Sequence, residues 1–371
     1  MSEISYSKIL TISIPTFNRG ILVRELLENI TGQVSKHKLE NKIEVQITNN
    51  ASSDNTEPII QSYSSKHNYI FYTKNETNIG LGPNVLKCMF LANGKYCLLL
   101  GDDDRLKPDS LPQLIAFLEE NPDTGLLIDT ANNKKDKVNK PTQLNLVQML
   151  ERYYYFMGNA GVFVVLSSYI KENYENRNFK GISFSWPQTQ FMIMSSYKHP
   201  EKKIQLDNFN LVGESEHTNI TLYNSYYLWK VAYYELVVDI ENIRQGVSNE
   251  VVRAAKKYFS NHAIQNFYNI LQCGVFIDDA ETKVKTRKHI LSHLTHFSFK
   301  EKILLNIIVM VLWLPDSLSK KFSNLFIYLT RGSKGLEKKN NFVKHEKKKM
   351  ELIKSKKETI IRDFSYEGAA D

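Results

Sequence analysis

The sequence predicts an α/β protein in which a mostly parallel, mixed sheet is flanked by helices and followed by a helical C-terminal extension. Three observations predict this fold class. Within the first 130 residues, short apolar strand patterns alternate with segments that carry apolar residues at helical spacing. Polar, turn-rich segments follow three of these strands, as expected at the ligand-binding edge of a parallel sheet. Beyond residue 235, helical patterns continue into a lysine-rich tail.

Five strands are predicted in the first 130 residues, because each is a short apolar or alternating run bounded by polar residues. Apolar residues at helical spacing fill the intervals, beginning with Leu22 to Val34 in the first of them. Ser110 and Gln113 stand at the spacing of a capping box, which predicts the start of the helix before the fifth strand. The predicted strands cover residues 9–14, 43–48, 69–72, 96–100 and 126–128.

The same patterns predict how the chain divides. We expect one domain over residues 1–235, in which residues 1–130 carry the alternation of strands and helices. Residues 132–143 are polar and predicted to form a loop, and residues 144–235 mix helical and extended segments that are rich in aromatic side chains. Residues 236–371 are expected to form a separate helical and basic region.

Basic charge is concentrated in the tail. The chain holds 48 Lys and Arg against 40 Asp and Glu, a net charge of +8. Residues 281–371 hold 20 against 10, a net of +10, which leaves 28 against 30, or −2, for the rest. The tail lacks the aromatic residues interleaved with basic ones that binders of single-stranded nucleic acid carry, so no nucleic-acid partner is expected.

The apolar block at residues 303–314, "ILLNIIVMVLWL", is about half as long as the ~20 apolar residues needed to span a bilayer. Two interpretations stay open: an anchor lying at a membrane surface beside anionic lipid, or a helix packed on the rest of the protein. The three cysteines, Cys88, Cys97 and Cys273, form no metal-binding or paired spacing. We expect a cytoplasmic protein, peripheral on the inner face of the plasma membrane if the block is an anchor.

Three consecutive aspartates, Asp102, Asp103 and Asp104, follow the predicted strand at residues 96–100. Crowded carboxylates repel one another and are stabilised by a cation, and a site made of oxygen atoms suits Mn²⁺ or Mg²⁺. The alternative is an acidic turn that caps the following helix. The polar segments "PTFN" and "NNASSD" are predicted at the same edge of the sheet, which favours a site for a metal ion and a nucleotide.

Five motifs in order resemble those of the family 2 glycosyltransferases, which have the GT-A fold. They are "SIPTFNR", "ITNNASSDNT", "NETNIGLGPN", "GKYCLLLGDDD" and "LKPDSL", and the resemblance covers roughly residues 7–130. The second and fourth motifs are most similar to the abequosyltransferase-like branch of the family. The resemblance implies a GT-A domain over residues 1–235, with its nucleotide-sugar half first and its acceptor half second.

The resemblance also implies roles for individual residues. Asp104, together with Asp102, would ligate the Mn²⁺ or Mg²⁺ ion. Asn49 stands where the family commonly has an aspartate, so the choice of nucleotide base stays open. Asn78 and Asn84 would be polar neighbours of the nucleotide. The positions implied to bind the nucleotide-sugar are Pro15, Thr16, Asn18, Asn50, Asp54, Gly80, Asp102 and Asp103.

Family 2 members invert the anomeric centre, which requires a base beside the acceptor hydroxyl. The acidic pair that usually supplies this base in the family is absent here, and Trp186 and Gln188 stand near its expected place. We predict that these two residues bind the acceptor, although Trp186 also suits a protein core. Glu214 is the predicted catalytic base. The alternatives for this role are Glu216, His217 and Asp207.

The sequence thus predicts a metal-dependent, inverting glycosyltransferase of the hexosyl or deoxyhexosyl type. Its expected donor is a nucleotide-sugar, and its expected acceptor is a bacterial surface glycan such as an O-antigen or capsule, with a lipid-linked form included. The alternative is a non-catalytic subunit on the same fold that binds nucleotides or carbohydrates. The sugar, the linkage and the oligomeric state are left open.

Overall fold

The structure is a computed structural model. It describes residues 6–131, 137–154, 157, 159–174, 187–213, 225–230 and 234–355. Contacts divide the chain into two compact units, each described by itself below. Unit 1 comprises Met1–Thr218 and Asp239–Ala255, and unit 2 comprises Asn219–Val238 and Lys256–Asp371. The division predicted at residue 235 stays a prediction.

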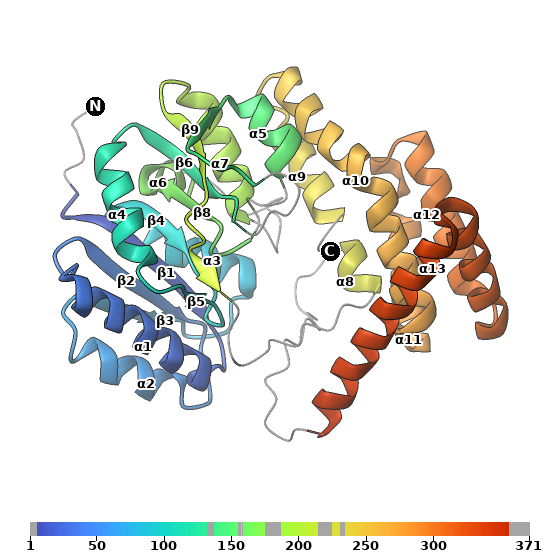
Figure 1. Cartoon of the computed structure of the whole chain (residues 1–371), viewed down its shortest axis with the longest axis horizontal. Helices are drawn as coiled ribbons and strands as arrows, with labels where there is room; N and C mark the ends of the chain where they lie inside the picture. Colours follow the sequence, from blue (N-terminus) through green and yellow to red (C-terminus); the bar gives the residue numbers. More distant parts are fainter. Residues whose placement is uncertain are drawn as a thin grey trace. The chain divides into compact units, whose positions relative to one another are not determined.

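Unit 1 is built on an eight-stranded sheet in the order β3-β2-β1-β4-β8-β6-β9-β7 (Figure 1). The first four strands of this order are parallel to one another, and β6 is parallel to β9. Strands β8 and β7 run antiparallel to their neighbours, so the predicted mostly parallel, mixed sheet is confirmed. The strands are β1 (Lys8–Thr16), β2 (Ile43–Asn49), β3 (Ile70–Lys74), β4 (Gly94–Leu99), β6 (Thr124–Asp129), β7 (Thr142–Leu144), β8 (Phe163–Leu166) and β9 (Lys203–Asp207).

The central strands are buried on both faces. All seven residues of β2 and all six of β6 are buried, and Leu10, Ile12 and Ile14 of β1 belong to the core. Strands covered on both sides carry nearly continuous apolar runs, which is why these segments could be recognised in the sequence. All five predicted strands are present, and their ends differ from the prediction by at most two residues.

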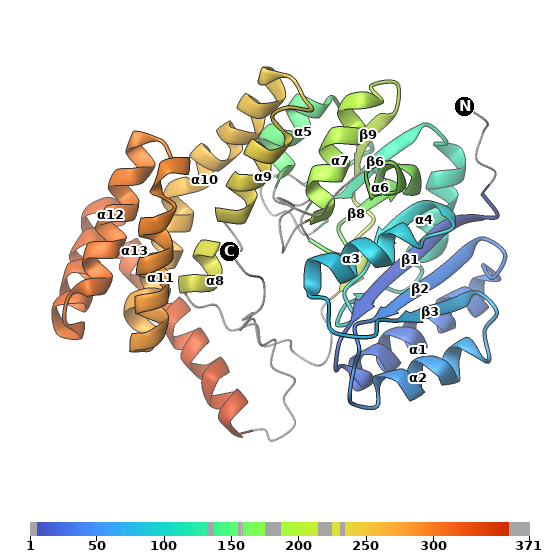
Figure 2. The ribbon, with the colours of Figure 1, turned by 180° about the vertical axis from the view of Figure 1, so that it is seen from behind.

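Helices cover both faces of this sheet. On one face α1 contacts α2 and α4, and Figure 1 shows this layer. On the other face α3, α6 and α7 contact one another, and Figure 2 shows them in front of the sheet. The helices of unit 1 include α1 (Gly20–His37), α2 (Thr56–Ser64), α3 (Leu81–Phe90), α4 (Ser110–Glu120), α5 (Leu146–Tyr153), α6 (Ser167–Tyr174) and α7 (Pro187–Lys198).

The predicted capping box at Ser110 and Gln113 is wrong. Helix α4 begins at Ser110 itself, so the N-cap position falls on Asp109, whose φ is 60°. The Asp109 carboxylate makes no cap and instead accepts from Lys36 Nζ at 2.7 Å and lies 2.6 Å from His37 Nε2. Both partners belong to α1, so Asp109 links the start of α4 to a helix that is distant in the sequence.

Unit 2 is helical, as predicted for the C-terminal region. Helix α13 contains a kink at Gly332, where φ is 63°. Gly274 of α10 lies against Leu312 of α12 so closely that a Cβ at this position would overlap the leucine side chain. Helices α9 and α10 contribute residues to both units. The helices beyond residue 224 are α8 (Ser225–Trp229), α9 (Glu235–Ile243), α10 (Asn249–Phe276), α11 (Ala280–Ser292), α12 (Phe299–Trp313) and α13 (Asp316–Ser355), with the 3₁₀ helix η3 (Leu294–His296).

Asp278 predicts a pH dependence of stability. Burial raises its pKa to about 6, although Ser225 donates to its carboxylate from both the backbone nitrogen and the hydroxyl. The unfolded chain releases this proton at lower pH than the folded chain, so the free energy of unfolding falls as pH rises from about 4 to about 6. The expected loss is about 2–3 kcal/mol. Urea titrations of the wild type and Asp278→Asn across this pH range measure it.

The neighbouring Asp279 supplies the control. Its carboxylate accepts from Thr282 N at 2.7 Å at the start of α11, and this backbone bond lowers its pKa. Asp279→Asn should therefore leave the loss of stability between pH 4 and 6 in place, whereas Asp278→Asn should remove it. Equal pH slopes in the wild type and Asp278→Asn would contradict the assignment.

Candidate functional site

The carboxyl ends of β1, β2 and β4 meet at one edge of the sheet. Thr16 at the end of β1 pairs with Asn49 at the end of β2, and Asn50 N donates to Thr16 O at 2.9 Å. Leu100, directly after β4, donates its backbone N–H to Ser13 O at 2.9 Å. The three polar segments that follow these strands therefore lie next to one another.

Arg19 joins two of these segments. Its Nη1 lies 2.7 Å from Asp102 Oδ1 and 3.4 Å from Asp103 Oδ2, and Thr16 Oγ1 donates to Asp102 Oδ2 at 2.8 Å. Asp102 and Asp103 are buried. Burial alone lowers the pKa of Arg19, but attraction to the two aspartates outweighs it and raises the pKa above its usual value. The sequence analysis did not identify Arg19 as a site residue. The only local indication was its place as a cation directly after the polar "PTFN" segment.

Asp104 closes a tight turn at Gly101. Gly101 N donates to Asp104 Oδ2 at 2.8 Å, and Asp104 N donates to Gly101 O at 3.0 Å. A Cβ on Gly101 would lie 2.7 Å from Asp103 Oδ1 and 2.9 Å from Asp104 Oδ2. Two carboxylate oxygens thus converge on one point. Arg105, which forms an ion pair with Glu25 of α1, holds the far end of the turn.

Gly161, ahead of β8, packs against this turn. Its φ is 73°, and its N donates to Leu99 O at 2.7 Å. A Cβ at this position would lie 2.6 Å from Val212 Cγ2 and 3.3 Å from Asp104 Oδ2. The position therefore requires glycine both for its backbone conformation and for the close approach of its neighbours. Nothing local in the sequence indicated this contact.

Gly161→Ala is expected to lower the free energy of unfolding by about 1–3 kcal/mol, because it combines a strained φ with a steric overlap. Thermal unfolding measures this effect. Gly32→Ala is the matched control, since nothing lies within 4 Å of a Cβ at this exposed position of α1. It should stabilise the helix by about 0.5–1 kcal/mol. A Gly161→Ala protein as stable as the wild type would contradict the packing described.

Asn50 holds the loop that follows β3. Asn50 Nδ2 donates to Asn78 Oδ1 at 2.8 Å, and Asn50 Oδ1 accepts from Ile79 N at 3.0 Å and from Asn75 Nδ2 at 2.9 Å. Gly80 follows with a φ of 90° at the N-terminus of α3. The amide of Asn50 is therefore engaged by protein groups, and it fixes the position of the loop at the edge of the sheet.

The loops after β1 and β2 are also bonded to each other. Asn18 N donates to Ser52 Oγ at 2.9 Å, and Ser53 N donates to Asn18 Oδ1 at 2.8 Å. Asp54 Oδ2 accepts from Gly20 N at 3.2 Å, so this carboxylate supports the start of α1. The structure thus brings Asn18 and Asp54 to the same edge as Thr16 and the aspartates, while Pro15 lies within β1 opposite Thr48.

Asn49 is fully buried at the end of β2. Its Oδ1 accepts from Ser52 N at 3.0 Å, whereas its Nδ2 has no hydrogen-bond partner within the described ranges. A carboxylate at this position would carry a charge into a buried site. The neutral amide avoids that cost.

The acceptor side is only partly covered by the described residues. Trp186, Glu214, Glu216 and His217 lie outside them. Gln188 lies in the first turn of α7, 2% exposed, and its Nε2 donates to Met157 O at 3.5 Å. Its predicted contact with an acceptor stays a prediction.

Two observations bear on the candidate bases. Gly213, the residue before Glu214, pairs with Arg105 in the small sheet formed by β5 (Arg105–Leu106) and β10 (Val212–Gly213). Asp207 lies at the carboxyl end of β9, where burial raises its pKa above the usual value and the charge of Asp129 adds to the rise. The described chain thus reaches the residue after the aspartate turn at Gly213, the residue that precedes Glu214 in the sequence.

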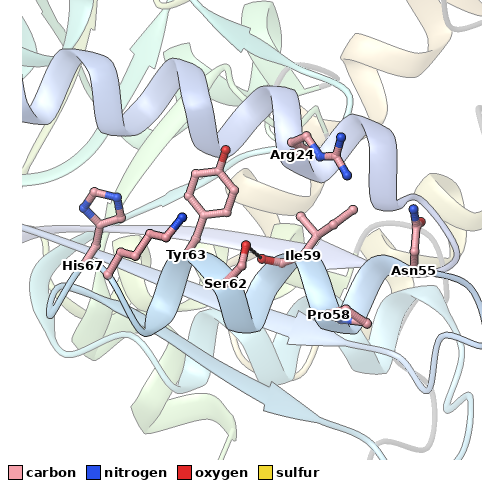
Figure 3. A pocket seen from close by; sticks show the side chains of 8 residues that line it. Arg24, Asn55, Pro58, Ile59, Ser62, Tyr63 and His67 are labelled. Atoms are coloured by element: carbon pink, nitrogen blue, oxygen red, sulfur yellow. Dashed lines mark hydrogen bonds between the residues drawn. The ribbon is translucent and has the colours of Figure 1, made fainter.

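A separate cavity of about 550 Å³ lies between α1 and α2 (Figure 3). In Figure 3 the side chain of Tyr63 extends from α2 toward α1, which contributes Arg24. None of the predicted site residues lines this cavity. The lining residues are Arg24, Asn55, Pro58, Ile59, Ser62, Tyr63, Lys66 and His67.

The sheet order, with helices on both faces and aspartates at a strand end, is that of the GT-A fold. The sequence model described as "Glycosyl transferase family 2" matches residues 11–198, half of the chain. The chain therefore belongs to the family 2 glycosyltransferases, as its motifs predicted, and it is an enzyme of this class. This assignment favours the enzyme over the non-catalytic subunit.

Three known proteins illustrate the similarity. Abequosyltransferase RfbV of Salmonella typhimurium is 33% identical over 210 residues, which cover 52% of this chain and 62% of that protein. The GalNAc(5)-diNAcBac-PP-undecaprenol beta-1,3-glucosyltransferase of Campylobacter jejuni is 32% identical over 113 residues, 30% of this chain and 35% of that protein. The chain thus spans less than two thirds of either relative.

The solved structure of mannosyltransferase PcManGT from Pyrobaculum calidifontis, in complex with GDP-Man and Mn²⁺, resembles the chain with a TM-score of 0.50 and 13% identity. The match covers 89% of this chain and 87% of that one. At this identity the likeness shows the fold.

Proposed function

We propose that the protein is an inverting, metal-dependent glycosyltransferase that moves a hexosyl or deoxyhexosyl group from a nucleotide-sugar to a hydroxyl of a bacterial surface glycan. The observation that carries the proposal is the aspartate turn at the end of β4, held by Arg19 beside the loops that follow β1 and β2. Parallel sheets bind their ligands at this edge. The donor would lie there, along Thr16, Asn18 and the loop at Gly80.

A divalent cation fits the residues of the turn. Among the described residues no group of three or more His, Cys, Asp or Glu side chains is arranged to hold a metal ion. Mg²⁺, however, usually takes one or two protein carboxylates and completes its shell with water and phosphate oxygens. The carboxylates of Asp102 and Asp104, which Thr16 Oγ1 and Gly101 N hold in this turn, are hard oxygen donors of the kind that such an ion prefers.

Asp104 and Asp102 would hold the Mn²⁺ or Mg²⁺ ion. When bound, such an ion neutralises the charge that develops on a diphosphate leaving group. Arg19 reduces the repulsion between Asp102 and Asp103 and keeps their carboxylates in place. The fold of unit 1 thus supplies both the anionic ligands for an ion and the cation that makes their clustering stable.

Glu214 is the proposed base for the acceptor hydroxyl. Its support is the pairing of Gly213 with Arg105, which leads the chain to the aspartate turn. Asp207 is the competing candidate, because its raised pKa suits a group that must accept a proton. A lipid-linked glycan is the proposed acceptor, and the name of the Campylobacter relative, which contains PP-undecaprenol, supports this class. Trp186 and Gln188 would bind it.

The test incubates the full chain with UDP-, GDP-, CDP- and TDP-sugars, Mn²⁺ and an undecaprenyl-diphosphate-linked glycan. Release of nucleoside diphosphate and the mass of the product measure transfer, and proton NMR measures the anomer formed. We expect one donor class to react, EDTA to stop the reaction and the anomeric configuration to invert. A retained configuration would contradict the single displacement, and full activity in EDTA would contradict the metal dependence.

Glu214→Gln should lower the rate of transfer at least about hundredfold, because a positioned base contributes about 10²–10⁴-fold. Slow hydrolysis of the donor should persist, since the donor site is intact. Asp207→Asn is the comparison variant and should keep most of the transfer activity. The reverse pattern would assign the base to Asp207.

A further inference from the structure

Helix α12 carries an apolar stripe on its exposed face. Phe299, Ile303, Met310 and Trp313 recur at intervals of four, seven and three residues, which places them on one side of a helix. Phe299 is 80% exposed and Trp313 is 79% exposed. The opposite side packs into unit 2 through Leu305, Ile308, Val311 and Leu312. The helix is therefore apolar nearly all round, although only one side is covered.

The first part of α13 repeats the pattern. Leu318, Phe322, Leu325 and Leu329 follow at intervals of four, three and four residues and are all exposed, Leu329 to 73%. Ile327 on the opposite side is buried. Helix α13 follows α12 directly in the chain and contacts it. We call these two stripes together the α12–α13 apolar face.

Lysines flank both stripes. Lys302 lies next to the stripe of α12 on the helix surface, and Lys321 lies next to that of α13 at the same angular offset. Basic residues continue along α13, and residues 281–371 carry a net charge of +10. Exposed apolar side chains with tryptophan at one end and lysines along the edge are typical of helices that lie in a membrane interface.

We propose that the α12–α13 apolar face docks on an anionic lipid surface, with its apolar side chains inserted among the headgroups and its lysines beside lipid phosphates. No helix within the described residues is long and apolar enough to cross a bilayer, which suits a surface position. A second copy of the chain would bring an identical net charge of +10 against the same face, and this repulsion disfavours self-association there.

The surface belongs to unit 2, and its binding requires neither donor nor acceptor. The proposal is therefore independent of the proposed transfer reaction. It also unites the two interpretations of residues 303–314, because one side of α12 packs on protein while the other is available to lipid.

Co-sedimentation of the full chain with phosphatidylcholine vesicles, with and without about one third phosphatidylglycerol, tests the proposal. We expect binding to the anionic vesicles and at least tenfold weaker binding by Phe299→Ser/Trp313→Ser. Phe71→Ser is the matched control, because Phe71 is an exposed aromatic residue on β3 of unit 1. Its binding should equal that of the wild type. Equal binding by the wild type and the double variant would overturn the proposal.

The charge contribution is measured separately. Lys302→Gln and Lys321→Gln should each weaken binding to anionic vesicles about fivefold, which corresponds to about 1 kcal/mol for each lysine near the surface. Lys198→Gln, an exposed lysine of α7, should have no effect. Lysine variants that bind as tightly as the wild type would overturn the anionic part of the proposal.

Two further measurements distinguish insertion into lipid from self-association. The tryptophan emission of the wild type should shift to shorter wavelength on anionic vesicles, and Trp313→Phe should remove most of this shift with its fold intact. Sedimentation velocity without lipid tests the second copy as occupant. An oligomer that dissociates in Phe299→Ser/Trp313→Ser, combined with no vesicle binding by the wild type, would overturn the proposal in favour of self-association.

Discussion

Replacing Arg19 by methionine is expected to lower the free energy of unfolding by about 3–5 kcal/mol and to abolish glycosyl transfer. Arg19 Nη1 lies 2.7 Å from Asp102 and 3.4 Å from Asp103, and both carboxylates are buried. Removing one partner of a buried ion pair leaves the other charge without compensation, which costs about this much. Urea unfolding at pH 7 measures the loss of stability.

Two variants show whether the loss of stability in Arg19→Met comes from the uncompensated charge of the aspartates. Arg244→Met removes the cation of an exposed pair, since Arg244 is 55% exposed and lies 3.2 Å from Glu241. That change should alter stability by at most about 1 kcal/mol. Arg19→Met/Asp102→Asn removes one of the two uncompensated charges and should recover part of the lost stability. A double variant no more stable than Arg19→Met would show that Arg19 acts through packing instead.

Asp104→Ala is the second large effect that we expect. It should lower the rate of transfer at least about hundredfold, because a metal ion that stabilises the leaving group lowers the activation free energy by several kcal/mol. The Asp104 carboxylate accepts a bond from Gly101 N, but it is less buried than Asp102, so the fold should persist. The rate as a function of Mn²⁺ concentration measures the effect.

Asp123→Ala is the matched control for this variant. Asp123 is an exposed aspartate of unit 1, and its Oδ2 lies 4.0 Å from Lys203 Nζ. Its removal should leave both the rate and the Mn²⁺ dependence unchanged. Wild-type activity in Asp104→Ala would contradict the assignment of the metal site.

The first half of the sheet could be predicted because its strands are short, apolar and separated by amphipathic helices. Strands β7, β8 and β9 could not be predicted from local patterns. Strand β8 lies between β4 and β6 and is antiparallel to both, although it follows them in the chain. Such a position depends on tertiary pairing, which no local periodicity encodes.

The same limit applies to the site. The aspartates could be placed from sequence, because parallel strands end at a common edge. Arg19 reaches Asp102 across 83 positions of chain, and Gly161 approaches Asp104 only through the placement of β8. Asn50 was predicted to bind the nucleotide-sugar, and nothing local in the sequence indicated that its amide is bonded to the loop after β3. Composition predicts a polar site, whereas the partner of each polar group depends on the fold.

Calorimetric titration of the wild type with UDP, GDP, CDP and TDP in Mn²⁺ shows directly whether the aspartate turn binds the diphosphate of the donor through a metal ion. We expect at least one nucleoside diphosphate to bind, and we expect EDTA or Asp104→Ala to weaken this binding at least about tenfold. Binding of equal strength in EDTA and in Asp104→Ala, or no binding of any of the four, would contradict this role of the turn.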